Sequence, residues 1–546
     1  MLFAISDGAL PSNVGGGYNL RIILRRIFDL ASQYGLNMDL MKIIEMHSKE
    51  LSGLYSHVGE SLNEINDVIE VERKRYENSK IAAQKIVSMV IEKHEPLTPE
   101  RVRTLYESNG ITPDFIKSIA ESKKVKIEIP EQSYNELVKG DFTEKRKEAK
   151  VTGIDLTDIP ATTKLFYGDA HESDSKVLLV AGNMVVLDKT PFYAESGGQE
   201  ADTGSIEGVG VKDVQSSGGV IVHTLVKPAS FKKGQSVHCI IDGERRMRLV
   251  AHHTATHLVS AAARAVLGKH AWQEGAKKSY DKAHIDISHY EKLSDKQIEE
   301  IESKANSYIM HGIKVTAEEM DRKTAESKFG FSIYQGHGTP AGKLRIIQIK
   351  DLKGNLIDAE ACGGLHLGGK ESEIGLIKII RSSRIHDGIN RIEFVAGPAA
   401  LEHVINMEHS IDNLAKLTGV DRDKLEPGLS AKMKELGMYK YSYEFMEEQL
   451  SGYVAKELSE ERDDYVVREL DYERSMLRKI ATKFADAKKK GTILIYNKRS
   501  EAVSVSGVES EEDALGFAKA EAKKLGMEFK GGGSKRIAEG RLEAKA

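Results

Sequence analysis

The sequence predicts a multidomain α+β protein, because both its length and its changing pattern of apolar residues indicate several folded segments. A chain of 546 residues is too long for one hydrophobic core and should divide into three or four domains. Apolar residues recur at helical spacing first, then in short strand-like runs, then within highly charged helices. We therefore expect a helical domain (1–150), a small β-barrel (151–242) joined to an α+β segment (243–397), a long helical or coiled-coil arm (398–490) and a small α/β globular domain (491–546).

The N-terminal segment is expected to be mainly helical. Beyond the glycines at 15–17, apolar side chains that share one helical face predict a helix over 18–33. Arg21 and Arg25 lie one turn apart on another face, where a solvated position is the simplest interpretation. A second long helical stretch is predicted over 54–92.

The middle of the chain changes to strands and then mixes both types. Runs such as 176–181 and 184–187, divided by Gly and Asn, predict a small β-barrel or sandwich. Farther on, Ser294 stands three residues before Gln297, a capping box that predicts a helix with one buried stripe. Two strands joined around residues 387–388 then complete the α+β segment.

The last third is predicted to hold long helices and a small terminal domain. Residues 399–490 are charged and carry too little apolar surface for a compact core, which favours long helices or a coiled coil. A strand over 492–496 and a helix over 511–525 follow. A glycine-rich turn between basic residues can bring backbone amides against phosphates, although a flexible linker explains it equally well. Its glycines are Gly531, Gly532 and Gly533.

Two short motifs about a hundred residues apart predict a metal site. His253 and His257 are four residues apart, so a helix places both imidazoles on one face. Cys362 and His366 flank a Gly-Gly pair that lets the chain fold back toward the same ion. Three nitrogens and one sulfur suit tetrahedral zinc, with metal–ligand distances of about 2.0–2.3 Å. The sequence leaves open whether these four ligands close the ion or substrate displaces one of them.

Several observations narrow the class of protein. A zinc peptidase requires Glu directly after the first His, where this chain has Thr254. Cys239 and Cys362 are the only cysteines, and a disulfide between them would remove a ligand, so a reducing cytoplasm is expected. The 79 Lys+Arg nearly balance the 83 Asp+Glu, so a nucleic acid would have to meet local basic faces. We find no signal peptide and no membrane-spanning run, which predicts a soluble protein.

Several segments of the sequence together resemble alanyl-tRNA synthetases. Residues 3–15 resemble the tRNA-recognition segment of that family, and 192–199 with 202–204 resemble the start of its editing domain. The two metal motifs and residues 391–397 complete the pattern. This resemblance implies one zinc ion per chain in an editing domain. It also suggests the C-terminal portion of such an enzyme, without the class II aminoacylation domain, so we expect no ligase activity and place ATP only in that missing domain.

The resemblance also carries over individual residues. Asn13 and, less closely, Glu107 correspond to the pair that reads the G·U base pair of the acceptor stem, while Gly16 stands where the family commonly has Arg. We count Arg21, Arg25 and the glycines Gly531, Gly532 and Gly533 among the further candidate tRNA contacts. From the sequence alone, a turn residue after Pro11 is the favoured explanation of Asn13.

Thr256 and Gln273 match family positions that line the editing pocket, and we predict them as its catalytic residues. Both can hydrogen-bond a serine hydroxyl or the terminal ribose. A bond from the Thr256 hydroxyl back to its own helix is the structural alternative.

The function expected is zinc-dependent hydrolysis of Ser-tRNA(Ala) and Gly-tRNA(Ala), together with recognition of tRNA(Ala). A pocket sized for alanine rejects serine or glycine by only roughly a hundredfold, so errors need a second site. One alternative is a non-catalytic module that binds tRNA and dimerises around a structural zinc. Another is a free-standing editing protein, although these usually lack the helical segment that begins at Phe3. The family further implies a homodimer formed through the C-terminal region.

Overall fold

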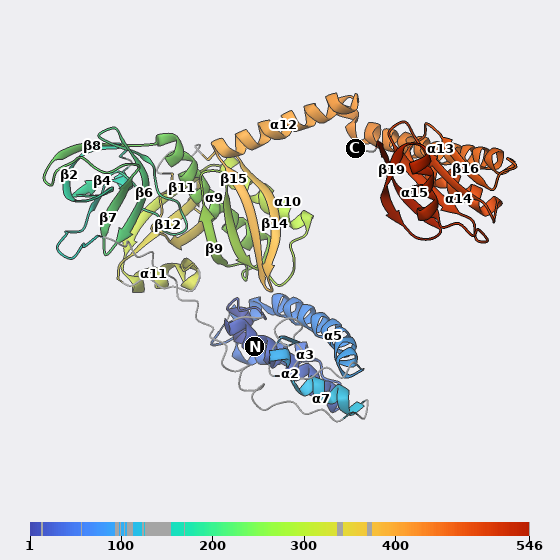
Figure 1. The fold of residues 1–546 in the computed structure, drawn as a ribbon. Coiled ribbons are helices and arrows are strands. Elements are labelled where there is room, and N and C mark those ends of the chain that lie inside the picture. The colour runs from blue at the N-terminus through green and yellow to red at the C-terminus, as the bar shows by residue number, and fades with distance from the viewer. Residues whose placement is uncertain are drawn as a thin grey trace. The chain divides into compact units, whose positions relative to one another are not determined.

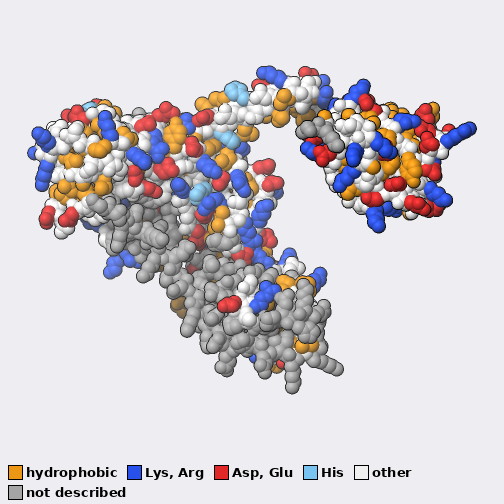
Figure 2. Space-filling view, viewed as in Figure 1, with side chains coloured by type: hydrophobic (Ala, Val, Ile, Leu, Met, Phe, Trp, Pro, Cys, Tyr) orange, Lys and Arg blue, Asp and Glu red, His pale blue; other side chains and the backbone are white. Residues whose placement is uncertain are grey.

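The computed structural model shows two compact units, Met1–Asn406 and Met407–Ala546 (Figure 1). Both units combine helices with sheets, so the predicted multidomain α+β class is confirmed. Basic and acidic side chains are intermixed over the surface in view (Figure 2). Every helix in the described part of the chain is too short or too polar to cross a membrane. The structure describes all residues except 13–14, 56, 93–97, 99, 103, 106–112, 123–124, 126–153, 169, 336–341, 368–373 and 545–546.

The first unit begins with a group of helices around a shared apolar core. The predicted helix over 18–33 is confirmed and begins slightly earlier, and its Leu24 packs with Ile5, Ile65 and Ile69. Asp39 caps the third helix by accepting a hydrogen bond from the backbone N–H of Lys42. These helices are α1 (Leu2–Ser6), α2 (Gly15–Gln33), α3 (Leu40–Leu51), α4 (His57–Glu60), α5 (Leu62–Glu92) and α7 (Pro113–Ser122).

A closed six-stranded barrel follows, in the order β2-β3-β7-β6-β5-β8. Gly182, at φ +62°, makes the tight turn from the first of these strands to the second, a conformation that favours glycine. The barrel strands are β2 (Glu172–Ala181), β3 (Met184–Leu187), β5 (Gly204–Ile206), β6 (Val209–Ser217), β7 (Val220–Leu225) and β8 (Ser236–Ile241). Beside them, β1 (Thr163–Lys164) pairs in parallel with β4 (Lys189–Thr190), and η1 (Leu165–Gly168) lies between these two in sequence.

The rest of the first unit is built around one buried helix, α9 (Gly243–Leu267). Every side chain from Leu249 to Ala263 is buried, because α9 contacts α10, β9, β10, β13 and β15. The predicted capping box of Ser294 and Gln297 is confirmed at the start of α10 (Asp295–Met310). One sheet has the order β14 (Ile377–His386), β15 (Ile389–Ala396), β10 (Ala283–Ser288), β9 (Gln273–Lys278). The other has the order β11 (Ile313–Met320), β12 (Leu344–Asp351), β13 (Leu356–Ala361), with α11 (Arg322–Phe329) and η2 (Phe331–Ile333) beside it.

The second unit carries a five-stranded sheet of order β16-β17-β18-β20-β19. Its strands are β16 (Tyr465–Glu469), β17 (Thr492–Tyr496), β18 (Glu501–Ser506), β19 (Met527–Gly533) and β20 (Ile537–Ala544). Its helices are α13 (Leu425–Ser459), α14 (Arg474–Ala487) and α15 (Ala514–Lys524), while α12 (Pro398–Thr418) and η3 (Arg422–Lys424) come before them.

The terminal domain begins earlier than the predicted boundary at residue 490. Strand β16 pairs with β17, and α14 packs on β17 and β18, so both belong with the terminal sheet. The sequence expectation missed this because both elements lie in a charged segment whose apolar partners come later in the chain.

Candidate metal centre

The four side chains predicted as metal ligands lie together in the interior of the first unit. One possible ligand atom from each of His253, His257, Cys362 and His366 lies within 4.8 Å of all the others. The Cys362 Sγ is 3.3 Å from His253 Nε2 and 3.5 Å from His366 Nε2. Helix α9 supplies the first two residues, and the segment after β13 supplies the others. The structure therefore brings both motifs to one point.

Neighbouring groups hold the outer nitrogens of the two α9 histidines. His253 Nδ1 lies 2.7 Å from Gln199 Oε1, and His257 Nδ1 lies 2.8 Å from Asp358 Oδ2. A carboxylate only accepts, so Nδ1 of His257 carries a hydrogen and Nε2 is the nitrogen that faces the other three ligands. That Nε2 is buried without a hydrogen-bond partner among the described residues. A buried nitrogen in this state, beside two imidazoles and a thiol, fits a zinc ion.

Two buried carboxylates lie close to Nδ1 of His257. Glu360 Oε2 lies 3.2 Å from His257 Nδ1, and Arg264 pairs with both Asp358 and Glu360. Burial raises the pKa of Glu360, and the nearby Asp358 raises it further. For His257, burial lowers the pKa, but Glu360 and Asp358 together raise it well above the ordinary value. The same negative charge would favour a cation at Nε2.

The pKa values of the other three ligands are shifted in directions that suit metal binding. Burial, with the positive Lys278 nearby, lowers the pKa of His253, and burial also lowers that of His366, so both rings are neutral. Burial raises the pKa of the Cys362 thiol, yet His257, Lys278 and the Gly364 N–H outweigh it and lower the pKa overall. Neutral imidazoles and a readily formed thiolate are the forms that bind zinc.

Close packing holds the loop that carries Cys362. A Cβ on Gly364 would lie 1.8 Å from Cε1 of His253, so only glycine fits there. Arg345 donates to the carbonyls of Cys362 and Gly364 at 2.8 and 3.0 Å, and the Tyr167 hydroxyl donates to that of Gly363 at 2.8 Å. The loop is therefore held from two sides.

The two predicted catalytic residues have different surroundings. The Thr256 hydroxyl donates to the His252 carbonyl at 2.8 Å, which is the structural alternative named above. Gln273 Nε2 donates to Gln335 Oε1 at 2.9 Å, and the Gln273 Oε1 is buried without a partner among the described residues. Thr254, rather than Thr256, contacts the loop that carries Cys362 and His366, with its Oγ1 3.4 Å from His366 Nδ1.

The structure places the candidate tRNA contacts in several settings. Arg21 is only 4% exposed and pairs with Glu72 and Asp387, so the solvated interpretation is wrong for it, and such a side chain is poorly placed to meet RNA. Arg25 also pairs with Glu72, at 2.8 Å. Asn13 and Glu107 lie outside the described residues.

The glycine run near the C-terminus is a strand rather than a turn or linker. Gly531, Gly532 and Gly533 belong to β19 and pair with β20. A Cβ on Gly531 would lie 2.3 Å from the Glu539 carbonyl oxygen, so glycine allows close approach of the two strands there.

Sequence reasoning missed the residues that orient the ligands. Asp358 and Glu360 are two residues apart on β13, so both side chains lie on the same face of the strand. This spacing was the signal in the sequence that could have identified them. Gln199 is the last residue of segment 192–199, which resembles the family. The neighbouring sequence does not indicate that Gln199 contacts His253, 54 residues away.

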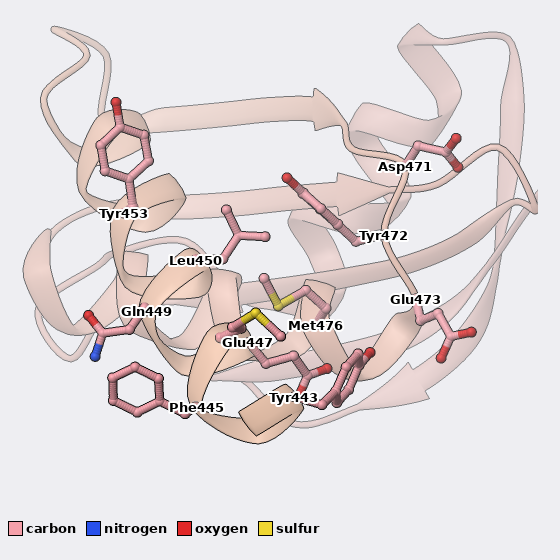
Figure 3. Close-up of a pocket in the computed structure, with 11 residues that line it drawn as sticks. Tyr443, Phe445, Glu447, Gln449, Leu450, Tyr453, Asp471, Tyr472, Glu473 and Met476 are labelled. Carbon is pink, nitrogen blue, oxygen red and sulfur yellow. The ribbon is translucent and has the colours of Figure 1, made fainter. Parts of the chain in front are cut away.

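A second concave site lies in the other unit, far along the chain from the ligands. A pocket of about 840 Å³ opens between α13 and the start of α14 (Figure 3). Aromatic and aliphatic side chains of α13 line it, among them Tyr443, Met446, Leu450 and Tyr453, together with Tyr472 and Met476.

Comparisons with known proteins match two parts of the chain to tRNA synthetases, and the second part contains Cys362 and His366. Residues 1–245 match the family model of class II (A) tRNA synthetases, and 344–393 match the second additional domain of threonyl and alanyl tRNA synthetases. The alanine–tRNA ligase of Nitrosopumilus maritimus is 40% identical over 78% of this chain and 46% of its own length. Those of Thermococcus kodakarensis and Pyrococcus furiosus are each 36% identical, over 84% and 99% of this chain and 51% and 60% of their own lengths. The chain spans about half the length of the curated relatives it matches.

The family match corrects one prediction. We expected the class II aminoacylation domain to be missing, and the match of residues 1–245 to the class II model overturns this. The expectations of no ligase activity, and of ATP only in a missing domain, rested on that absence and lose their basis with it.

Proposed function

Proceeding from this similarity to alanine–tRNA ligases, we propose that the chain serves alanine–tRNA ligation and removes serine and glycine wrongly attached to tRNA(Ala). The observation that carries the editing part is the buried group of three histidines and one cysteine, in which His257 Nε2 is left without a described partner. ATP enters the proposal through the class II match, and alanine-dependent exchange of pyrophosphate into ATP measures that reaction separately.

The chemistry of the ester explains why such a centre is useful. Serine differs from alanine by one hydroxyl and glycine is smaller, so size alone rejects them by roughly a hundredfold at most. Bound zinc would polarise the ester or hold the amino group of the aminoacyl end. Gln273, whose Oε1 is buried without a described partner, offers an acceptor for a serine hydroxyl.

We expect purified protein to release serine from Ser-tRNA(Ala) and to contain one zinc per chain. Cys362→Ala should lower deacylation at least about tenfold and remove most of the zinc, because even the loss of a group that only hydrogen-bonds a ligand costs about 10–100-fold in metal affinity. Cys239→Ala is the matched control, since Cys239 is buried in the barrel strand β8 and stands apart from the ligand group. Equal deacylation by the two variants would remove the metal from the mechanism.

The alternative of a structural zinc has one observation in its favour. Four protein ligands complete a tetrahedral shell, which is typical of structural sites. Under this alternative, zinc removal would lower the melting temperature, and the intact protein would bind tRNA without releasing serine.

Dimerisation and cellular location belong to the same proposal. Large apolar side chains stay exposed along α13, which supports a second copy of the chain as its partner. Both cysteines are free, which supports a reducing location such as the cytoplasm.

A further inference from the structure

We infer that Gln199 is a positioning residue that holds the two metal-binding motifs against each other. The inference rests on the proposed function only in one respect, namely that the positioned metal would serve the proposed editing reaction. Gln199 is fully buried and lies between β4 and β5, in a segment separate from both motifs. Among the described contacts, its side-chain oxygen meets a group from each motif.

The two contacts fix the orientation of the Gln199 amide. Its Oε1 lies 2.7 Å from His253 Nδ1 on α9 and 3.4 Å from the backbone N–H of Leu365, between Cys362 and His366. A backbone N–H can only donate, so the atom it meets is the amide oxygen. The same oxygen then accepts from His253 Nδ1, which leaves the lone pair of His253 on Nε2, 3.3 Å from Cys362 Sγ.

The segment around Gln199 is held firmly against β9. The Lys278 backbone N–H donates to the Gly198 carbonyl at 2.7 Å, and its buried ammonium donates to that of Gly197 at 3.0 Å. A Cβ on Gly198 would lie 2.0 Å from the Ala276 carbonyl oxygen, so the backbones meet with no room between them. The amide oxygen therefore has a fixed position from which to orient both motifs.

This arrangement parallels the one at His257. There Asp358 accepts from Nδ1 and leaves Nε2 free, and here an amide oxygen plays the same part for His253. The Nε2 of Gln199 is buried without a partner in the described part of the chain, so a variant that keeps only the oxygen loses no described hydrogen bond.

The test compares three variants of the full chain by zinc affinity, measured in competition with a chromophoric chelator. Gln199→Leu removes the acceptor and should lower zinc affinity about 10–100-fold. Gln199→Glu keeps an acceptor and should lose less than about tenfold in affinity, which is below the loss expected when the hydrogen bond is removed. Gln215→Leu, in barrel strand β6, is the control and should leave affinity unchanged.

Two readouts keep the test decisive. Cobalt in place of zinc should give a tetrahedral thiolate spectrum in the natural protein and in Gln199→Glu, and an altered one in Gln199→Leu. Unchanged affinity and spectrum in Gln199→Leu would overturn this inference alone, whatever the deacylation rate. Absence of metal binding by the natural protein would overturn the inference and the proposed zinc-dependent editing together.

Discussion

Single hydrogen-bond partners decide which nitrogen of each α9 histidine is free to bind a cation. Asp358 accepts from His257 Nδ1 and Gln199 accepts from His253 Nδ1, so Nε2 is the nitrogen of each ring that faces the other ligands. The centre is thus prepared for a metal by groups that do not themselves reach the ion, and its affinity should depend on them.

Close packing at Gly364 gives a prediction at the same scale. Gly364→Ala would drive a methyl group into the His253 ring, 1.8 Å from Cε1, so we expect zinc content to fall well below one per chain and the melting temperature to drop. Gly363→Ala is the matched control, because its Cβ would meet only the Tyr167 hydroxyl at 3.9 Å. Similar zinc content in both variants would show that the ligand loop tolerates displacement.

The ligands could be predicted from sequence because each pair is local. His253 and His257 are one helical turn apart, and Cys362 and His366 flank a tight turn, so spacing alone indicated a shared ion. Arg21 shows the limit of this reasoning. Its partner Glu72 lies 51 residues away, and nothing in the helical pattern of α2 reveals a buried ion pair.

Among the elements, β19 shows how a glycine run can be misread. Such runs are typical of turns, but Gly531 pairs with Gly540 of β20 and the two backbones approach closely. Local composition cannot distinguish these cases, because the cross-strand partner determines the outcome. The capping box of α10, in contrast, involves residues only three apart, and it was predicted correctly.

The pairing of β19 with β20 predicts that alanine destabilises the protein at one glycine and is tolerated at its neighbour. Gly531→Ala would place a Cβ 2.3 Å from the Glu539 carbonyl oxygen, and overpacking of this kind costs about 1–3 kcal/mol. Gly532→Ala meets nothing within 4 Å and should leave stability nearly unchanged. Thermal unfolding of the full chain would measure both, and equal melting temperatures would contradict this account of the strand.

For the molecule as a whole, the repeating pattern of apolar residues on α13 suggests how two copies of the chain would associate. Its apolar residues alternate in steps of three and four, which is the spacing of a coiled-coil seam. These residues are 42–70% exposed, and several also line the pocket in Figure 3. They are Leu436, Tyr439, Tyr443, Met446, Leu450 and Tyr453. A matching seam from a second copy would cover them.

We expect the full chain to sediment as a dimer at micromolar concentration. Leu436→Glu places a charge in the seam and should yield a monomer. Met438→Glu is the control, because Met438 is similarly exposed, at 65% against 61%, but lies off the seam. A monomeric natural protein, or a monomer from both variants, would speak against this interface.

The burial of α9 on every side limits how this part of the gene can change. Inserting or deleting one residue within Leu249–Thr256 would rotate everything beyond it by roughly 100°. That rotation would swing His257 away from Cys362 and would also turn Leu258 and Val259 out of their places in the core. Length changes there should therefore abolish expression of folded protein, whereas point substitutions among the four ligands should leave a folded chain without its metal.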